Sequence, residues 1–318
     1  MRTTMNVLLT GNNLALRAGE RPVPVPGSDQ LLVRTRALAL NNADLAHGGD
    51  ERIAGYEFSG EVIGVGSGVD AGLVGARVAG TTPAAFAQYV VVHHRHVITI
   101  PESVSFEDAA SLPTALLTES GALSVAGVGA GDSVLITAAA SGIGLIGVQL
   151  ARLMGAAPVI ATTRSAHKRA LLERIGADTA ITTGEQDLVA AVLEATAGQG
   201  VSAVLDHVAG EMIAAVVPAT RLGGKIISVG RLGGSEATVD LYALAARQAT
   251  LQSVSYGFTP PETIGDLLAA LESRVLPALA DGRIKAVVDT VLPFADAASA
   301  VERLGSGQAL GKIVLRMP

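Results

Sequence analysis

Residues 39–60, ALNNADLAHGGDERIAGYEFSG, gather polar side chains that can take part in a reaction. Asn41 can donate an amide hydrogen bond, and Tyr56 can donate one from its phenol or deliver a proton. His47 is a second candidate proton donor because its ordinary pKa lies near neutral pH, although a lone loop histidine is often a surface residue. Asp44 is expected to fix the loop through a cap or an ion pair, since a free carboxylate beside developing negative charge is unfavourable. The segment predicts chemistry by hydrogen bonding and proton transfer.

Ligands for a metal are sparse in the sequence. The chain contains no cysteine, which excludes disulfides, iron–sulfur clusters, thiolate zinc sites and a cysteine nucleophile. His93, His94 and His96 are close together, and strand alternation would place His94 and His96 on one face. Because no third ligand follows at a usual spacing, this cluster is interpreted as a solvated strand end, and no metal site is predicted.

A glycine-rich turn predicts a nucleotide-binding site. The motif GxGxxG runs from Gly142 to Gly147, directly after a predicted strand and at the start of a predicted helix. Gly142 allows the tight turn, Gly144 lets a pyrophosphate approach the backbone, and Gly147 permits close packing of the helix on the sheet. The helix N-terminus favours the anion. The candidate cofactor-binding residues of this turn are Ser141, Gly142, Ile143 and Gly144.

The residues that follow the second strand of this region indicate which dinucleotide is bound. An NAD site carries an acidic residue there, whereas this chain has Thr163, Arg164 and Ser165, with Lys168 one turn later. Arg164 can grip a 2′-phosphate in a fork, Lys168 can add a point charge, and Ser165 can donate a hydrogen bond. NADP(H) is therefore the predicted cofactor, and an ordinary solvated helix start is the alternative.

The pattern of apolar residues predicts a split first domain and an inserted second one. Residues 31–100 form short runs typical of a β-rich barrel-like module, and residues 106–125 predict a connecting helix that Pro113 kinks or restarts. Strands then alternate with helices, which implies a parallel sheet covered on both faces. A final helix near residues 261–280 precedes a strand pair expected to complete the first domain. The predicted strands of the parallel sheet and of the final pair are 133–137, 158–163, 179–182, 203–205, 225–229 and 250–255, then 286–292 and 312–315.

Composition narrows the class of protein. The 318 residues are 49% hydrophobic and 16% charged, with 37 glycines, which is typical of a compact α/β protein. The net charge is −6, and neither a basic stripe nor interleaved aromatic residues predict a nucleic-acid surface. No apolar run reaches the length of a membrane span, and the start lacks the pattern of a secretory signal, so a cytoplasmic location is expected.

Blocks along nearly the whole sequence resemble one family. They are LLVRTRALALNNADL, AGYEFSGEVIGVG, FAQYVVV, ASLPTALLTESGAL, the glycine turn, RSAHKRALLERIGAD, AVLDHVAG, GGKIISVG and GKIVL. In order and spacing they resemble the zinc-free quinone oxidoreductase branch of the medium-chain dehydrogenase/reductase superfamily. The resemblance implies a groES-like catalytic domain, residues 1–115 and 257–318, split around a Rossmann domain with a doubly wound parallel sheet, residues 116–256, with the nucleotide in the cleft between them.

The same resemblance implies further site residues. Thr118 falls where the family has a threonine that contacts the nicotinamide carboxamide. Two strand ends, where open α/β sheets bind ligands, supply the remaining cofactor-binding candidates, and ordinary strand-end turns are the alternative. These candidates are Asp206, Val208, Val229, Gly230 and Arg231.

The resemblance also predicts the type of reaction. Zinc-dependent members carry cysteine and histidine where this chain has Asn41 and Tyr56, so zinc is not expected. Without a Lewis acid, hydride transfer to a quinone or an α,β-unsaturated carbonyl is favoured, because the charge spreads into an enolate that hydrogen bonds can stabilise. Many members of the branch have a tyrosine where this chain has Ala46, followed by His47, so the proton donor stays open.

Three functions remain open at this point. The first is an NADPH-dependent reductase of a small quinone or enone, and the second is a trans-acting enoyl-thioester reductase, which a basic rim near Arg34 and Arg36 would support. The third is a non-catalytic NADPH-binding protein. No nucleic-acid or membrane partner is expected. The apolar strand TLQSVS would be a sheet edge, so a homodimer is predicted, with a covering loop as the alternative.

Overall fold

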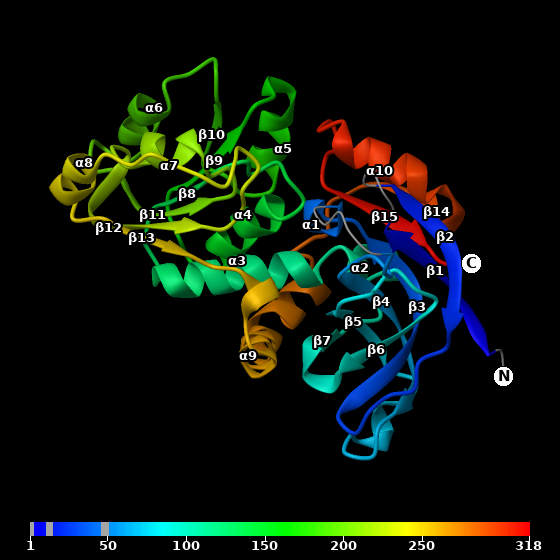
Figure 1. The fold of residues 1–318 in the computed structure, drawn as a ribbon. Coiled ribbons are helices and arrows are strands. Elements are labelled where there is room, and N and C mark those ends of the chain that lie inside the picture. Colours follow the sequence, from blue (N-terminus) through cyan, green and yellow to red (C-terminus); the bar gives the residue numbers. More distant parts are fainter. Residues whose placement is uncertain (1–2, 11–14, 46–50) are drawn as a thin grey trace. The chain divides into compact units, whose positions relative to one another are not determined.

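The structure is a computed structural model that describes residues 3–10, 15–45 and 51–318. The chain folds into two compact units, of which unit 1 comprises residues 1–114 and 260–318 and unit 2 comprises residues 115–259 (Figure 1). Unit 1 is rich in antiparallel strands, and unit 2 contains a parallel sheet. The predicted fold class, a β-barrel-type domain split around an inserted doubly wound domain, is confirmed.

Unit 1 is built from sheet strands that come from both ends of the chain. The C-terminal strand β15 pairs with β3 in antiparallel register, with Val314 opposite Ala39, as the red and blue strands in Figure 1 show. The order of the main sheet is β14-β15-β3-β4-β5-β7, with β6 paired to β3, while β1 and β2 form a separate hairpin. The strand bounds are β1 Thr4–Thr10, β2 Leu16–Pro22, β3 Gln30–Ala39, β4 Glu57–Val65, β5 Arg77–Thr81, β6 Tyr89–His93, β7 Val97–Thr99, β14 Val288–Pro293 and β15 Lys312–Arg316.

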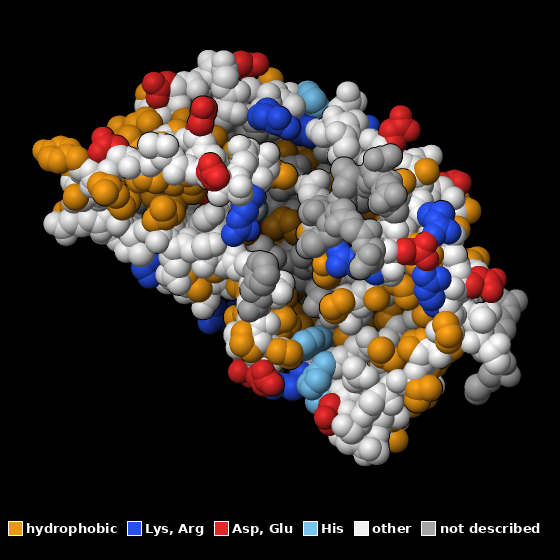
Figure 2. Space-filling view, in the orientation of Figure 1, with side chains coloured by type: hydrophobic (Ala, Val, Ile, Leu, Met, Phe, Trp, Pro, Cys, Tyr) orange, Lys and Arg blue, Asp and Glu red, His pale blue; other side chains and the backbone are white. Residues whose placement is uncertain are grey.

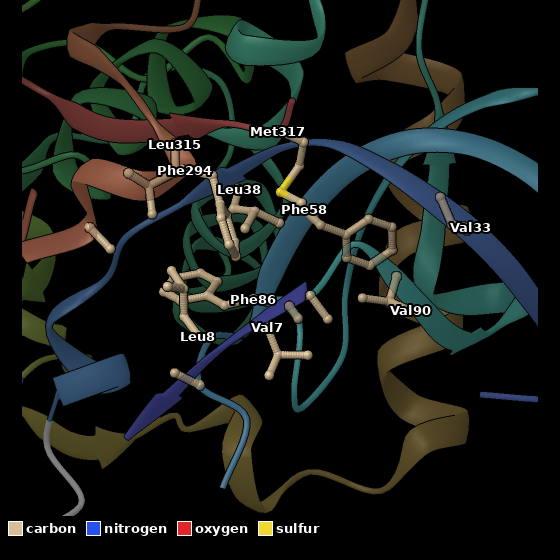
Figure 3. Packing of buried hydrophobic residues seen from close by; sticks show 14 of the residues in the cluster. Val7, Leu8, Val33, Leu38, Phe58, Phe86, Val90, Phe294, Leu315 and Met317 are labelled. Atoms are coloured by element: carbon tan, nitrogen blue, oxygen red, sulfur yellow. The ribbon is translucent and has the colours of Figure 1, made fainter. Parts of the chain in front are cut away.

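The core of unit 1 follows from alternation along these strands. In β3 every second residue from Leu31 is buried, because successive side chains of a strand point to opposite faces. Phe58, Phe86 and Leu38 are fully buried and pack with Met317 in one cluster (Figure 3). Burying such a side chain contributes roughly 1.5–3 kcal/mol. The cluster therefore ties the C-terminal residues to the N-terminal strands.

The described part of unit 1 contains few helices. This agrees with the β-rich module predicted for residues 31–100. The predicted connector is interrupted at Pro113, where α2 has ended and α3 begins, which confirms the restart. Proline suits the first turn of a helix because its missing N–H has no partner there in any case. The helix bounds are α1 Asn42–Leu45, α2 Phe106–Ala110, α9 Pro261–Ala280 and α10 Ala297–Gly305 in unit 1, and α3 Pro113–Ala126 at the start of unit 2.

Unit 2 contains a six-stranded parallel sheet. Its order is β10-β9-β8-β11-β12-β13, and all six predicted strands are present. The central strands are buried along their whole length, which explains why they read as continuous apolar runs. The bounds are β8 Val134–Ile136, β9 Val159–Thr163, β10 Thr179–Thr182, β11 Val201–Asp206, β12 Thr220–Ser228 and β13 Thr250–Ser253.

Helices connect the parallel strands of unit 2 and lie around the sheet (Figure 1). Each contributes an apolar side to the core, as Leu172 of α5 and Val192 of α6 show. Their bounds are α4 Gly144–Leu153, α5 Arg169–Arg174, α6 Leu188–Ala195, α7 Glu211–Val216 and α8 Leu241–Ala246. Among the helices of the described residues, none combines the length and the apolar character that crossing a membrane requires.

Candidate active site

The segment after β3 is held by a reciprocal cap. The backbone N–H of Asn41 donates to Oδ2 of Asp44 over 2.6 Å, and the backbone N–H of Asp44 donates to the carbonyl of Asn41 over 3.0 Å. An acidic side chain that reaches back to the residue preceding a short helix is a capping-box arrangement. The prediction that Asp44 fixes this loop is confirmed.

The carboxyl group of Asp44 lies in an unusual environment. The residue is 3% exposed, and its Oδ1 has no hydrogen-bond partner among the described residues. Burial raises the pKa of Asp44 to about 7, against the lowering effect of the Asn41 N–H. The charge of Glu57 raises the pKa further and the charge of Lys312 opposes it. Asp44 is therefore a titrating group near neutral pH.

Asn41 belongs to a buried ionic cluster. Its Nδ2 donates to Oε1 of Glu57 over 2.9 Å, and its Oδ1 accepts from Nζ of Lys312 over 2.6 Å. Lys312 also donates to Oε1 of Glu57, whose Oε2 accepts from the N–H of Thr114 over 3.0 Å. Glu57 and Lys312 are 0% and 4% exposed at their side chains. The cluster fixes the orientation of the Asn41 amide.

Strand register explains why these residues meet. Ala39 in β3 lies opposite Glu57 in β4 on one side and opposite Val314 in β15 on the other. The ends of three neighbouring strands therefore bring Asn41, Glu57 and Lys312 together. One of the two Nδ2 hydrogens of Asn41 is bonded to Glu57. The prediction that Asn41 donates to a substrate enolate therefore concerns the other Nδ2 hydrogen.

Tyr56 lies immediately before β4 and is partly exposed. Its position depends on Gly55, whose φ of +86° favours glycine and where a Cβ would approach the Phe86 ring to 2.0 Å. The Tyr56 phenol makes no hydrogen bond with the described residues, and its role as a donor stays a prediction. His47 and Ala46 lie outside the described residues, so the prediction for His47 also stays a prediction.

Two of the three glycines in the glycine turn of unit 2 make close contacts inside the protein, and the predicted approach of a pyrophosphate to Gly144 stays a prediction. A Cβ at Gly144 would lie 2.7 Å from the Cα of Ala139, and a Cβ at Gly147 would lie 2.3 Å from Oε2 of Glu119. Neither position tolerates a side chain without a shift. Gly142 does not have a positive φ, and the left-handed residue of this turn is Ala138, with φ of +45°.

Backbone donors are available at this turn. The hydroxyl of Ser141 accepts from the N–H of Gly144 over 3.1 Å, so Ser141 caps α4. The N–H groups of Gly142 and Ile143 have no acceptor among the described residues. Two free N–H groups beside a helix N-terminus form a suitable site for a pyrophosphate.

The predicted selectivity residues follow β9. Thr163 is buried and its Oγ1 accepts from the N–H of Ser165 over 3.2 Å, which shapes the turn. Arg164 is exposed. Lys168 is 6% exposed and interacts within the protein, and its role toward a 2′-phosphate stays a prediction. Arg164 is the more exposed cation of the two.

Asp206 has a different role from the one predicted. It is fully buried, and its carboxylate accepts from the Thr137 hydroxyl over 2.6 Å and from the Ala209 N–H over 2.7 Å. These contacts join the ends of β8 and β11 and leave the carboxylate no free approach for a cofactor. The correction is that Asp206 positions the strand ends.

The other strand-end candidates lie together at the carboxyl ends of β11 and β12. The N–H groups of Val229 and Gly230 donate to the carbonyl of Asp206 over 2.7 and 3.1 Å. Glycine is required at position 230 because a Cβ would lie 2.5 Å from the His207 carbonyl oxygen. Val208 is partly exposed and Arg231 is exposed. Thr118 is partly exposed in α3. The roles of these residues toward a cofactor stay predictions.

A buried pair of ionisable residues, Glu119 and His207, was missed by the sequence patterns. Nδ1 of His207 lies 2.9 Å from the Thr137 carbonyl oxygen, and since a carbonyl only accepts, Nδ1 must carry hydrogen. Nε2 faces Oε1 of Glu119. Burial alone lowers the pKa of His207, but the charge and hydrogen bond of Glu119 outweigh it and raise that pKa. The pair thus shares one proton between Nε2 and Oε1.

The described side chains do not assemble a metal site. No three His, Asp or Glu residues of the described part of the chain lie close enough together to hold a metal ion. Nε2 of His96 instead donates to the Pro261 carbonyl over 2.8 Å, and Arg95 pairs with Asp266. The ammonium of Lys312 is bonded to Oδ1 of Asn41, so a cation already lies on that side chain.

Comparisons with known proteins agree with this two-unit arrangement. The family described as Alcohol dehydrogenase GroES-like domain matches residues 27–102, and Zinc-binding dehydrogenase matches residues 142–273. Prostaglandin reductase-3 of Bos taurus is 30% identical over 327 residues, which are 93% of this chain and 84% of that protein. A phenolphthiocerol/phthiocerol polyketide synthase of Mycobacterium tuberculosis is 31% identical over 306 residues. That match covers 92% of this chain and 14% of the length of the synthase.

Solved structures extend the similarity to the whole fold. A mycobacterial quinone oxidoreductase is 30% identical with a TM-score of 0.86, covering 98% of this chain and 99% of that one. A mycobacterial protein solved in complex with NADPH is 29% identical with a TM-score of 0.87, at 98% and 99% coverage. The quinone oxidoreductase from Coxiella burnetii is 27% identical with a TM-score of 0.81, at 99% and 100% coverage.

The fold and the glycine turn, with these relatives, define an oxidoreductase of the dinucleotide-dependent class. The chain belongs to the medium-chain dehydrogenase/reductase superfamily, in its quinone oxidoreductase branch, as the sequence blocks predicted.

Proposed function

We propose that the protein is an NADPH-dependent reductase that transfers hydride to a quinone or another α,β-unsaturated carbonyl compound without zinc. The observation that carries this proposal is the turn at Gly142 and Ile143, whose two N–H groups have no acceptor among the described residues and lie beside the N-terminus of α4. The exposed Arg164 fits a 2′-phosphate. The similar mycobacterial protein solved with NADPH supports the same cofactor. Bound at this turn, NADPH supplies the hydride.

The residues present do not fit a catalytic zinc ion. Asn41 and Tyr56 replace the cysteine and histidine ligands of zinc-dependent members, and the chain has no cysteine to substitute for them. The Asn41 oxygen is occupied by Lys312. An amide and a phenol donate hydrogen bonds, which suits the delocalised charge of an enolate better than the concentrated charge of an alkoxide.

An enoyl-thioester reductase is the second candidate. The polyketide synthase relatives favour it, although the chain spans 14% of the first of them. The expected basic rim is weaker than predicted, because Arg34 and Arg36 both pair with Glu61. A pantetheine phosphate would have to compete with that carboxylate.

Turnover assays distinguish the candidates. Oxidation of NADPH is followed at 340 nm with a benzoquinone, a simple enone and a short enoyl-coenzyme A thioester, each compared with a reaction that lacks acceptor. We expect turnover of the quinone or the enone. Tight NADPH binding without turnover of any acceptor would contradict the enzyme proposal and favour the non-catalytic NADPH-binding protein.

Replacing Arg164 by alanine is expected to weaken NADPH binding roughly 10- to 100-fold and to leave NADH binding within about twofold. The reason is that a charge-assisted hydrogen bond is worth roughly 1.5–3 kcal/mol and that NADH lacks the 2′-phosphate. Titration calorimetry with both dinucleotides measures the effect. The control is Arg174→Ala, which removes an exposed arginine at the end of α5 and should leave the binding of both dinucleotides unchanged. Equal losses for NADPH and NADH would contradict the role of Arg164.

A homodimer through the edge of the parallel sheet is also proposed. All four residues of β13 are exposed, and β13 is the last strand in the sheet order. Large apolar side chains are exposed nearby, including Leu241 at 74% and Tyr242 at 83%, and Figure 2 shows hydrophobic side chains gathered at the left of its view. Light scattering is expected to give twice the chain mass of 32.1 kDa. Leu251→Lys is expected to shift it to the monomer, whereas a monomeric parent protein would contradict the proposal.

A further inference from the structure

We propose that Tyr256 donates the proton that completes the reduction. The inference rests on the proposed function and identifies the group that the sequence left open. Tyr256 and the helix residues against which it packs belong to unit 2.

The phenol of Tyr256 packs against helix α3. Tyr256 opens a short 3-10 helix, Tyr256–Phe258, that follows β13. Its phenol oxygen lies against Gly121, where a Cβ would be only 1.4 Å from that oxygen. Gly121 is three residues after Thr118, so both lie on one face of the helix. The phenol is therefore within one helical turn of the residue that the family resemblance assigns to the nicotinamide.

The phenol of Tyr256 is protonated at neutral pH and makes no hydrogen bond with the described residues. Burial raises the pKa of Tyr256, and the charge of Glu119 adds to this, to about 12. The phenol thus stays protonated throughout the neutral range. It makes no hydrogen bond with the described residues, and the residue is partly exposed, which leaves the proton accessible to a ligand.

Glu119 does not take part in this step. Its Oε1 faces His207, and its Oε2 lies where a Cβ of Gly147 would be 2.3 Å away. Glu119 precedes Gly121 by two residues in α3, and residues two apart on a helix do not face each other. The proton of Tyr256 is therefore replaced from solvent, to which the residue is partly exposed.

Atoms and electrons balance in the proposed step. Hydride from the reduced nicotinamide forms a C–H bond at the β-carbon, and the electron pair of the double bond moves into an enolate. The Tyr256 O–H bond breaks and its proton forms the second C–H bond, at the α-carbon. The phenolate then takes one proton from solvent, so each turnover consumes one hydride and one proton.

Tyr256→Phe tests the donor directly. The acceptors are a short enoyl-coenzyme A thioester or a simple enone, whichever the parent enzyme reduces, and a benzoquinone, whose reduced anion accepts protons from water. We expect kcat with the first acceptor to fall roughly 100-fold, as for loss of a general acid. The Kd for NADPH and the rate with benzoquinone should stay within about threefold. A kcat within threefold of the parent enzyme on the enone or thioester would overturn the inference.

Gly121→Ala is a matched variant that keeps the phenol but displaces it, because the added methyl group occupies the position of the phenol oxygen. It should lower kcat as much as Tyr256→Phe does. Ser124→Ala, at an exposed position of the same helix, is the control and should keep full activity. If Gly121→Ala does not fold, as judged by circular dichroism, Tyr256→Phe alone decides. A parent enzyme that turns over no acceptor contradicts the proposed function, whereas full turnover by Tyr256→Phe contradicts only the assignment of the donor.

A titration without turnover tests the setting of the phenol. The protein is labelled with 3-fluorotyrosine, the resonance of residue 256 is assigned by its loss in Tyr256→Phe, and its pKa is read from ¹⁹F spectra. We expect this pKa to lie above the ordinary value of a tyrosine, because burial and the charge of Glu119 raise it, and we expect Glu119→Gln to lower it. A pKa at or below the ordinary value would contradict the buried, protonated phenol on which the donor role depends.

Discussion

Glu57→Gln is expected to lower the free energy of unfolding by about 3–5 kcal/mol. Glu57 is fully buried, and its carboxylate accepts from Lys312, from Asn41 and from the N–H of Thr114. Glutamine fills the same space but removes the charge, so the Lys312 ammonium is left buried without an ionic partner. Breaking one side of a buried ion pair in this way is typically that costly. Urea unfolding followed by circular dichroism measures the change.

The matched control lies in the same strand. Glu61 pairs with Arg34 and Arg36 at the surface of β4, and Glu61→Gln should cost less than about 1 kcal/mol. Adding Lys312→Met to Glu57→Gln should restore part of the lost stability, since a neutral side chain of similar length leaves no buried charge. Equal losses in Glu57→Gln and Glu61→Gln would show that burial of this pair has no energetic consequence.

Asp44→Asn is expected to make the protein more stable at pH 8, by up to about 4 kcal/mol. Burial raises the pKa of Asp44 from 3.8 to about 7, so the folded state binds this proton more tightly than the unfolded state does. The stability that this proton gives is fully present below pH 4 and is lost as the pH rises from 4 through 7. Three pKa units correspond to about 4 kcal/mol. Asparagine has no charge to bury, so its stability should not fall over this range.

Unfolding free energies at pH 4, 6 and 8 test this prediction. The parent protein and Asp44→Asn should have similar values at pH 4 and should separate as the pH rises. Asp266→Asn, which removes an exposed partner of Arg95, serves as the control and should follow the parent curve. The prediction fails if Asp44→Asn and the parent protein lose stability in parallel between pH 4 and pH 8.

Local sequence patterns were sufficient for much of the fold. The six parallel strands of unit 2 are short apolar runs bounded by glycine and polar residues, and a strand buried on both faces must be apolar along its length. Pro113 marked a helix start because its ring suits a first turn. The edge position of β13 followed from its place at the end of the alternation.

The buried ionic groups could not be predicted in the same way. Glu57 and Lys312 meet across 255 residues of sequence, and no local pattern reports such a distant partner. Glu119 and His207 are 88 residues apart. The available signal was a single charged residue inside an apolar segment, as in TALLTESGAL and GKIVL. The burial of Lys168 was not predicted either, because a lysine at a helix start is usually solvated.

The return of β15 to the first sheet has a consequence for synthesis of the chain. Chains are made from the N-terminus, and domains generally fold as units while synthesis continues. All of unit 2 is complete once residue 259 has been made, whereas unit 1 still lacks residues 260–318 at that moment. Until Lys312 emerges, Glu57 has no cation for its carboxylate. We therefore expect unit 2 to fold first during synthesis. The strands of unit 1 that are made earlier should complete their sheet only after residues 260–318 have been made.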